Sequence, residues 1–142
     1  MDGVIIEWGD EIMKHYHVVA AVVCHDSKYL CMQKGKTKFE YTSYKWEFPG
    51  GKIEPGETPQ QALARELMEE MEYPVEVGEE LTTVTHEYPD FSITMTAFLC
   101  TPKAEANGFK RKEHADSKWC CKDELQGLDW AAADVGVVES IL

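Results

Sequence analysis

The chain has 142 residues, of which 44% are hydrophobic and 28% charged, a composition typical of a globular protein with a substantial buried core. Its formal net charge of −12 argues against a nucleic-acid polymer as partner, because a phosphate backbone requires a basic face. No apolar run approaches the ~18 residues of a membrane span, and acidic residues interrupt the start where a secretion signal needs an apolar core.

The first third of the chain predicts strands and one long loop. Residues 1–12 are expected to be an N-terminal extension, in which residues 4–8 either add a strand or contact a partner. The apolar, β-branched run 18–24 predicts a strand buried on both faces. A turn separates it from residues 29–34, which predict its hairpin partner. The polar and aromatic residues 35–45 predict a loop.

A helix is predicted to follow a double glycine. Thr58 is suited to the N-cap, Pro59 to the first helical position, and Gln61 to the reciprocal bond of a capping box. At roughly 100° per residue, the apolar side chains share one arc and the charged ones the other. The apolar arc holds Leu63, Ala64, Leu67, Met68 and Met71, and the charged arc holds Arg65, Glu66, Glu69 and Glu70.

The charged arc has two explanations. It is either a solvated face, with Arg65 and Glu69 as an i,i+4 ion pair, or a binding surface for a cation. Glu66 and Glu70 form a like-charge i,i+4 pair, which costs a few tenths of a kcal/mol unless something neutralises it. Hard divalent cations take oxygen ligands, and such a cation also reverses the local charge enough to admit a phosphorylated ligand.

The second half of the chain predicts two strands and then short elements. Residues 75–88 and 91–102 are expected to be strands joined by a tight turn. Residues 103–117 predict a loop. The remaining elements are a short strand at 118–121, a helical turn at 122–128 with Asp123 as N-cap, and a C-terminal helix at 131–142.

These elements predict a single domain, residues 1–142, with an α+β fold arranged as an α/β/α sandwich. The five cysteines are an odd number without repeated spacing, which indicates reduced thiols in a cytoplasmic protein. Cys120 and Cys121, with His114 nearby, suggest zinc, but the second Cys-x-x-Cys half of such a site is missing.

The spacing around the helix resembles a known motif. Gly51, five residues, Glu57, seven residues and then "RELMEE" is similar to the Nudix box, G-x5-E-x7-R-E-U-x-E-E-x-G-U, where U is aliphatic. The segments "EYPDFSITM" (87–95), "KEHADSKW" (112–119) and "LDWAAADVGVV" (128–138) are also similar to the MutT-like subfamily of Nudix hydrolases. The resemblance covers residues 13–142 and implies a mixed β-sheet with the box helix and a C-terminal helix packed on it.

The chain departs from the box at its end, where Glu72 and Tyr73 stand in place of glycine and an aliphatic residue. The glycine is expected to cap the helix in a left-handed conformation, which another residue adopts at a cost of about 1 kcal/mol. The departure is therefore expected to affect the helix end and not the metal ligands.

The resemblance implies Mg²⁺- or Mn²⁺-dependent hydrolysis of a nucleoside triphosphate to the monophosphate and pyrophosphate. Its implied metal ligands are Glu69 and Glu70 with the Gly50 carbonyl. Glu66 corresponds to a box position that either binds metal or acts as general base. Glu113 is a second candidate for ligand or base, with a plain surface glutamate as the alternative. Arg65 and Glu57 are implied to orient the carboxylates.

Substrate contacts are implied less directly. Asp134 matches the position that contacts the base in MutT-like enzymes, and it suits either a cytosine amine or, when protonated, a guanine carbonyl. Phe48 either packs on the base or belongs to the core. Lys34, with Lys36 and Lys38, either contacts phosphates or is solvated.

The implied partner is a small nucleotide, and the chain is expected to be a monomer or homodimer with no membrane contact. Oxidised dGTP or a cytidine nucleotide is the expected substrate. The alternatives are a nucleotide sugar or another nucleoside diphosphate derivative, and a non-catalytic nucleotide-binding module.

Overall fold

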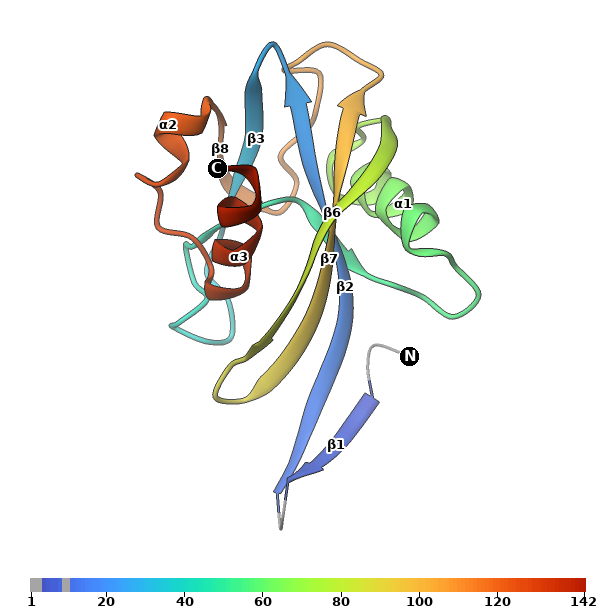
Figure 1. The fold of residues 1–142 in the computed structure, drawn as a ribbon, viewed down its shortest axis with the longest axis vertical. Helices are drawn as coiled ribbons and strands as arrows, with labels where there is room; N and C mark the ends of the chain where they lie inside the picture. Colours follow the sequence, from blue (N-terminus) through green and yellow to red (C-terminus); the bar gives the residue numbers. More distant parts are fainter. Residues whose placement is uncertain (1–3, 9–10) are drawn as a thin grey trace.

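A twisted mixed sheet lies between two helical layers in the computed structural model, which describes residues 4–8 and 11–142 (Figure 1). The strand order is β4-β3-β2-β7-β6, with β1 and β5 pairing with β2 and with β8 pairing with β3. The strands are β1 (Val4–Trp8), β2 (Glu11–His25), β3 (Lys28–Lys34), β4 (Trp46–Glu47), β5 (Gly50–Lys52), β6 (Val75–Glu87), β7 (Phe91–Pro102) and β8 (His114–Cys120).

The long strand β2 organises the sheet. It runs parallel to β7 and antiparallel to β1, β3 and β5. Its apolar run alternates between the two faces, so that Val19 and Ala21 pack into one core while Ala20 and Val22 pack into the other. The strand buried on both faces is confirmed.

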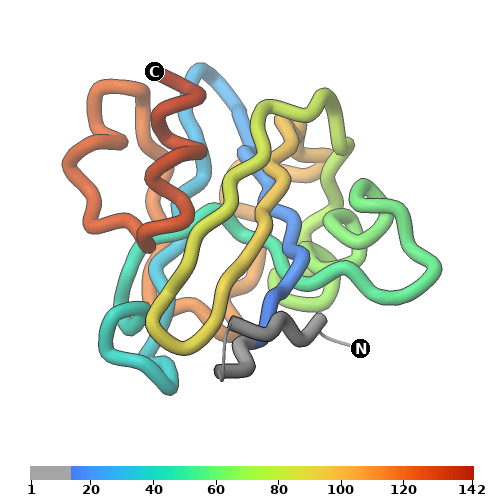
Figure 2. Tube along the Cα trace, turned by 60° about the horizontal axis from the view of Figure 1, so that its bottom comes forward, coloured from blue at the N-terminus to red at the C-terminus, as the bar shows by residue number. Residues whose placement is uncertain are grey.

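Each face of the sheet is covered by a different helix. Helix α1 (Pro59–Met71) packs on the face of Val19 and Ala21, whereas α3 (Ala132–Ile141) covers the opposite face together with the short α2 (Lys122–Leu125). Figure 2 shows the same separation along the chain trace, with the green α1 segment and the red α3 segment on different sides of the strands. The predicted α+β sandwich is confirmed.

Helix α1 begins as predicted. Thr58 accepts a hydrogen bond from the backbone of Gln61, and the Gln61 side chain accepts one from the backbone of Thr58. The apolar arc is narrower than predicted, however, because Met68 is 48% exposed while Leu63 and Leu67 are fully buried. The sheet covers only the central part of that arc.

Two predictions near the C-terminus were wrong. Residues 114–117 belong to β8 and not to a loop, because backbone pairing with β3 extends from Tyr29 to Lys34. The N-cap of α2 is Cys121 and not Asp123, and the Cys121 N–H donates to the Glu124 side chain at 3.0 Å.

The expected N-terminal extension is only partly described, since residues 1–3 and 9–10 lie outside the described residues. Within it, residues 4–8 form strand β1, which is the strand alternative for this segment. No helix in the described part of the chain is long and apolar enough to span a membrane.

Candidate active site

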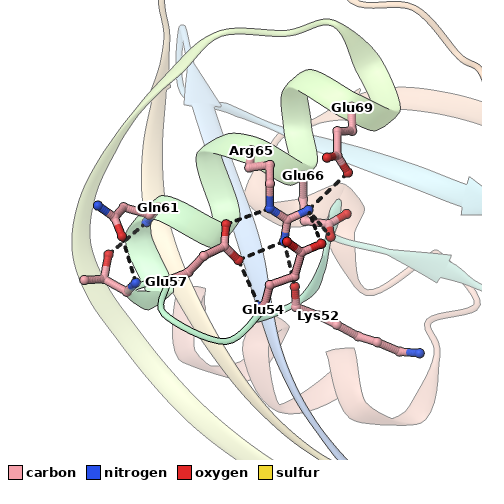
Figure 3. A network of polar contacts seen from close by, with 8 residues as sticks. Lys52, Glu54, Glu57, Gln61, Arg65, Glu66 and Glu69 are labelled. Atoms are coloured by element: carbon pink, nitrogen blue, oxygen red, sulfur yellow. Dashed lines mark hydrogen bonds and ion pairs between the residues drawn. The ribbon is translucent and has the colours of Figure 1, made fainter. Parts of the chain in front are cut away.

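Arg65 is the centre of a polar network at the exposed side of α1 (Figure 3). Its guanidinium donates two bonds to Glu57, at 2.7 and 3.0 Å. It also donates to Glu66 at 2.9 Å, to Glu69 at 3.1 Å and to the carbonyl oxygen of Lys52 at 3.1 Å. The fork of donors thus connects the helix to the glycine-containing strand β5 and orients three carboxylates at once.

Glu57 supports this network from the loop before α1. Its carboxylate also accepts a hydrogen bond at 2.9 Å from the backbone N–H of Glu54. The hydrogen bonds from Arg65 lower the pKa of Glu57, and those same bonds raise the pKa of Arg65. Glu57 is therefore an ionised partner that keeps the arginine in place.

Glu70 lies in a crowded set of carboxylates. Burial, together with the charges of Glu66, Glu47 and Glu113, raises the pKa of Glu70 to about 8. Burial also raises the pKa of Glu66, although its bond to Arg65 acts in the opposite direction. The four carboxylates therefore lie in a site with too little compensating positive charge.

The double glycine allows the backbone to pass close to these carboxylates. A Cβ atom on Gly51 would lie 2.4 Å from the carboxyl carbon of Glu66, and one on Gly50 would lie 1.9 Å from the Val19 carbonyl oxygen. Gly50 pairs with Ala20 of β2, so the strand cannot move away. Only glycine fits at position 50, whereas a side chain at position 51 would displace the carboxylate of Glu66.

The donor set fits a hard divalent cation. Across residues 4–8 and 11–142, no three His, Cys, Asp or Glu side chains lie in an arrangement ready to hold a metal ion. Arg65 engages Glu66 and Glu69, and Glu70 hydrogen-bonds to Glu66. Even so, oxygen donors that raise one another's pKa are the ligands that Mg²⁺ and Mn²⁺ prefer, because the cation supplies the missing charge.

A cavity of about 680 Å³ lies beside the carboxylates. Gly50, Gly51, Phe48 and Asp134 all form part of its wall. The Phe48 N–H donates to the Asp134 carboxyl at 3.0 Å, and the Phe48 ring stacks on Trp130 with 4.8 Å between centroids. Phe48 thus belongs to the core and lines the cavity at the same time.

Asp134 is 2% exposed, and burial raises its pKa well above the usual range, with the nearby charge of Glu47 adding to the effect. One carboxyl oxygen is engaged by the Phe48 N–H. The side chain therefore favours the neutral acid, which can donate a proton to a ligand acceptor.

Aromatic side chains form another wall of the cavity. Phe39 stacks on Phe91 at 5.7 Å, and Tyr88 stacks on both Tyr41 and Phe91. The Tyr41 hydroxyl donates to Asp90 at 2.8 Å, which ties the loop 35–45 to the β6–β7 turn. Flat apolar surfaces of this kind suit a heterocyclic base.

Of the three lysines that the sequence suggested as phosphate contacts, two line the cavity and one does not. Lys34 lines the cavity and lies 3.6 Å from Glu47, and Lys38 lines it next to the Phe39 ring. Lys36 is exposed and is not part of the wall. Lys14 and Lys52 also line the cavity, and the sequence analysis did not single them out.

Sequence reasoning also missed Glu47, and it considered His114 only as a possible zinc ligand. Glu47 lines the cavity, its charge acts on both Glu70 and Asp134, and His114 lies 3.0 Å from it. The available signal was the position of Glu47 three residues before the double glycine. Glu113, which was predicted, is exposed and immediately precedes His114.

The family model for the NUDIX domain matches residues 15–140. The CTP pyrophosphohydrolase of Escherichia coli is 33% identical over 130 residues, covering 92% of this chain and 93% of that protein. The 8-oxo-dGTP diphosphatase of Proteus vulgaris is 42% identical over 88 residues, covering 62% of this chain and 78% of that protein.

The fold is also similar to solved structures of related proteins. The E. coli ORF135 protein superposes with a TM-score of 0.76 at 32% identity, covering 91% of this chain and 89% of that one. MutT from methicillin-resistant Staphylococcus aureus superposes with a TM-score of 0.67 at 36% identity, covering 91% and 96%.

Proposed function

The chain belongs to the NUDIX family as a MutT-like hydrolase of acid anhydrides, and from this premise we propose that it hydrolyses a nucleoside triphosphate to the monophosphate and pyrophosphate. One observation carries the proposal. The Glu66 carboxylate that Arg65 orients lies against Gly51, and Gly51 forms part of the wall of a cavity of about 680 Å³ that is also lined by aromatic side chains and a buried acid. Such a site offers a place for a base on one side and for phosphates on the other.

Nudix hydrolases in general depend on a divalent metal, and we propose Mg²⁺ or Mn²⁺ here. Glu66, Glu69, Glu70 and Glu113 would hold it with the Gly50 carbonyl. When bound, such a cation neutralises phosphate charge and acidifies a water molecule. Arg65 and Glu57 keep the carboxylates oriented, and either Glu66 or Glu113 accepts the proton of the attacking water.

We propose oxidised dGTP as the first substrate. A neutral Asp134 can donate a hydrogen bond to a guanine carbonyl, Phe48 lines the same wall, and Lys34 lies where it can approach phosphates. The 8-oxo-dGTP diphosphatase of P. vulgaris is a relative that supports this choice. CTP is the second candidate, because an ionised Asp134 accepts from the cytosine amine and the E. coli relative is a CTP pyrophosphohydrolase.

The experiment is a panel of triphosphates and nucleotide sugars assayed with Mg²⁺, Mn²⁺ or EDTA. We expect metal-dependent release of pyrophosphate, and the highest kcat/KM for 8-oxo-dGTP or CTP. Preferred hydrolysis of a nucleotide sugar contradicts the substrate class. A folded protein that binds nucleotides without turnover in either metal contradicts catalysis.

We propose that residues 1–142 act as one domain. We also propose that the protein works as a monomer or homodimer on small nucleotides, and that it is cytoplasmic with reduced cysteines. All five cysteines are free in the structure, which supports the reduced state.

A further inference from the structure

Glu72 ends helix α1 in the left-handed conformation, with φ 50° and ψ 41°. Its backbone N–H donates to the Met68 carbonyl at 3.0 Å, as a helix cap should. An L-residue with a side chain adopts this conformation only at a cost, and the box pattern has glycine here. The contacts of the Glu72 side chain are what this residue provides and glycine could not.

Those contacts are two lysines from the loop 103–113. One oxygen of Glu72 lies 2.8 Å from Lys112 Nζ, and the other lies 3.2 Å from Lys110 Nζ. The backbone N–H of Lys110 also donates to the last helical carbonyl, that of Met71, at 2.8 Å. Lys112 Nζ donates at 3.4 Å to the carbonyl of Glu69. Glycine at position 72 offers none of the carboxylate contacts.

The second departure from the box contacts the same loop. Tyr73 is fully buried, and its hydroxyl donates to the carbonyls of Glu105 and Ala106 at 3.1 and 3.3 Å. Its ring packs edge-on against Phe109 with 5.6 Å between centroids. Both unusual residues at the helix end therefore hold the loop, Tyr73 near its start and Glu72 near its end.

Glu113 follows directly from the part of the loop that Glu72 holds. On its other side, His114 lies 3.0 Å from Glu47 at the cavity. The exposed Glu113 is thus placed between two anchors, the Glu72–Lys112 pair and the His114–Glu47 pair. Loss of the first anchor leaves the backbone before Glu113 without its ionic attachment to α1.

We propose that Glu72 is a positioning residue, which binds Lys110 and Lys112 and so holds Glu113 next to the carboxylates of α1. This inference rests on the proposed hydrolase function, in which Glu113 is a metal ligand or the general base. Glycine would be the better residue if position 72 only capped the helix. The glutamate is therefore assigned a role in the reaction.

Three variants test the inference through activity. Glu72→Gln keeps the side-chain size and the backbone cost but removes the charge, Glu72→Gly restores the favoured cap, and Lys112→Gln removes one partner. We expect each to lower kcat about tenfold or more while KM for the nucleotide stays within about twofold, because Glu113 is misplaced. Glu72→Gly should lower kcat even though its unfolding midpoint is at or above that of the parent protein.

The effect should also depend on Glu113. In a Glu113→Gln background, the substitutions at Glu72 should change kcat by less than about twofold, because coupled residues are not additive. The matched control is Lys118→Gln, which breaks another exposed pair, to Glu124 at 3.7 Å, and should leave kcat unchanged. Full activity of Glu72→Gln, or an equal loss with and without Glu113, overturns the inference.

A measurement that needs no turnover separates this inference from the proposed function. Amide hydrogen exchange over residues 105–113 should be faster in Glu72→Gln than in the parent or in Lys118→Gln. Unchanged exchange overturns the anchoring even if the enzyme is active. Faster exchange in a protein whose parent hydrolyses no triphosphate supports the anchoring and overturns the proposed function.

Discussion

The carboxyl group of Asp134 on α3 accepts a hydrogen bond at 3.0 Å from the backbone N–H of Phe48, two residues before the double glycine. The two residues are 86 positions apart in the sequence. This bond joins the C-terminal helix to the segment between β4 and β5, and both Phe48 and Asp134 line the cavity. A substitution at Asp134 is therefore expected to change what the cavity binds without dispersing the rest of the site.

Asp134→Asn tests the base contact. An amide oxygen can still accept from Phe48, while an NH₂ group replaces the acid on the side toward the cavity. We expect the ratio of kcat/KM for 8-oxo-dGTP over CTP to rise by about tenfold or more, because the NH₂ group still donates to a guanine carbonyl but cannot accept from the cytosine amine. Asp129→Asn, at an exposed aspartate paired with Lys45, is the control. An unchanged ratio would remove Asp134 from the base contact.

The stability of the metal-free protein should fall as pH rises. Burial and neighbouring carboxylates raise the pKa of Glu70 to about 8, above its value in the unfolded chain. The folded state therefore binds the extra proton, so the stabilisation is complete below pH ~4.5 and is lost as pH rises through about 8. Urea unfolding in EDTA across this range measures the slope.

The comparison with Glu70→Gln isolates that contribution. Burial lowers the pKa of His15 below the ~6.5 of the unfolded chain, so its contribution to stability grows as pH rises toward ~6.5 and is constant above that value, which opposes the trend in the lower part of the range. Subtracting the pH profile of Glu70→Gln from that of the parent cancels His15. A difference that stays flat from pH ~4.5 to ~8 contradicts the buried, proton-binding state of Glu70.

Glu70→Gln should also separate catalysis from folding. Its side chain is proposed as a metal ligand, so we expect kcat to fall about 10²-fold or more while the protein remains folded. The thermal unfolding midpoint without metal should not fall, because a neutral amide replaces a carboxyl group that is buried among other carboxylates. Glu76→Gln on β6 is the exposed control. Near-normal turnover would contradict the assignment of Glu70.

Arg65→Lys tests whether geometry or charge orients the carboxylates. Lysine keeps the positive charge but cannot reproduce the paired bonds to Glu57 together with those to Glu66 and Glu69. We expect a loss of about 1–3 kcal/mol in the free energy of unfolding and a lower kcat. Denaturant unfolding and steady-state assays measure both. Arg111→Lys, at an exposed arginine, should leave the free energy of unfolding unchanged. If Arg65→Lys and Arg111→Lys lose equally little stability and activity, the geometry of Arg65 does not orient the carboxylates.

Much of the helical half of the site was predictable because its signals are local. Thr58 and Gln61 lie within one turn of each other, and the capping box they form is encoded by that spacing. The separation of Glu57 from Arg65 places both on the same side of the helix start, where they pair at 2.7 Å. The left-handed conformation of Glu72 was likewise predicted from its position after the last helical turn.

The amino-acid sequence by itself determined the helix, its caps, the carboxylate spacing and the buried strand, since each depends on neighbours within a few residues and on the periods of helix and strand. Only the tertiary structure decided that Glu47 lies near Glu70, that Asp134 meets Phe48, and that Glu72 holds Lys110 and Lys112. These contacts join distant segments, and their partners are set by sheet register and by which face each helix covers, which no local pattern encodes.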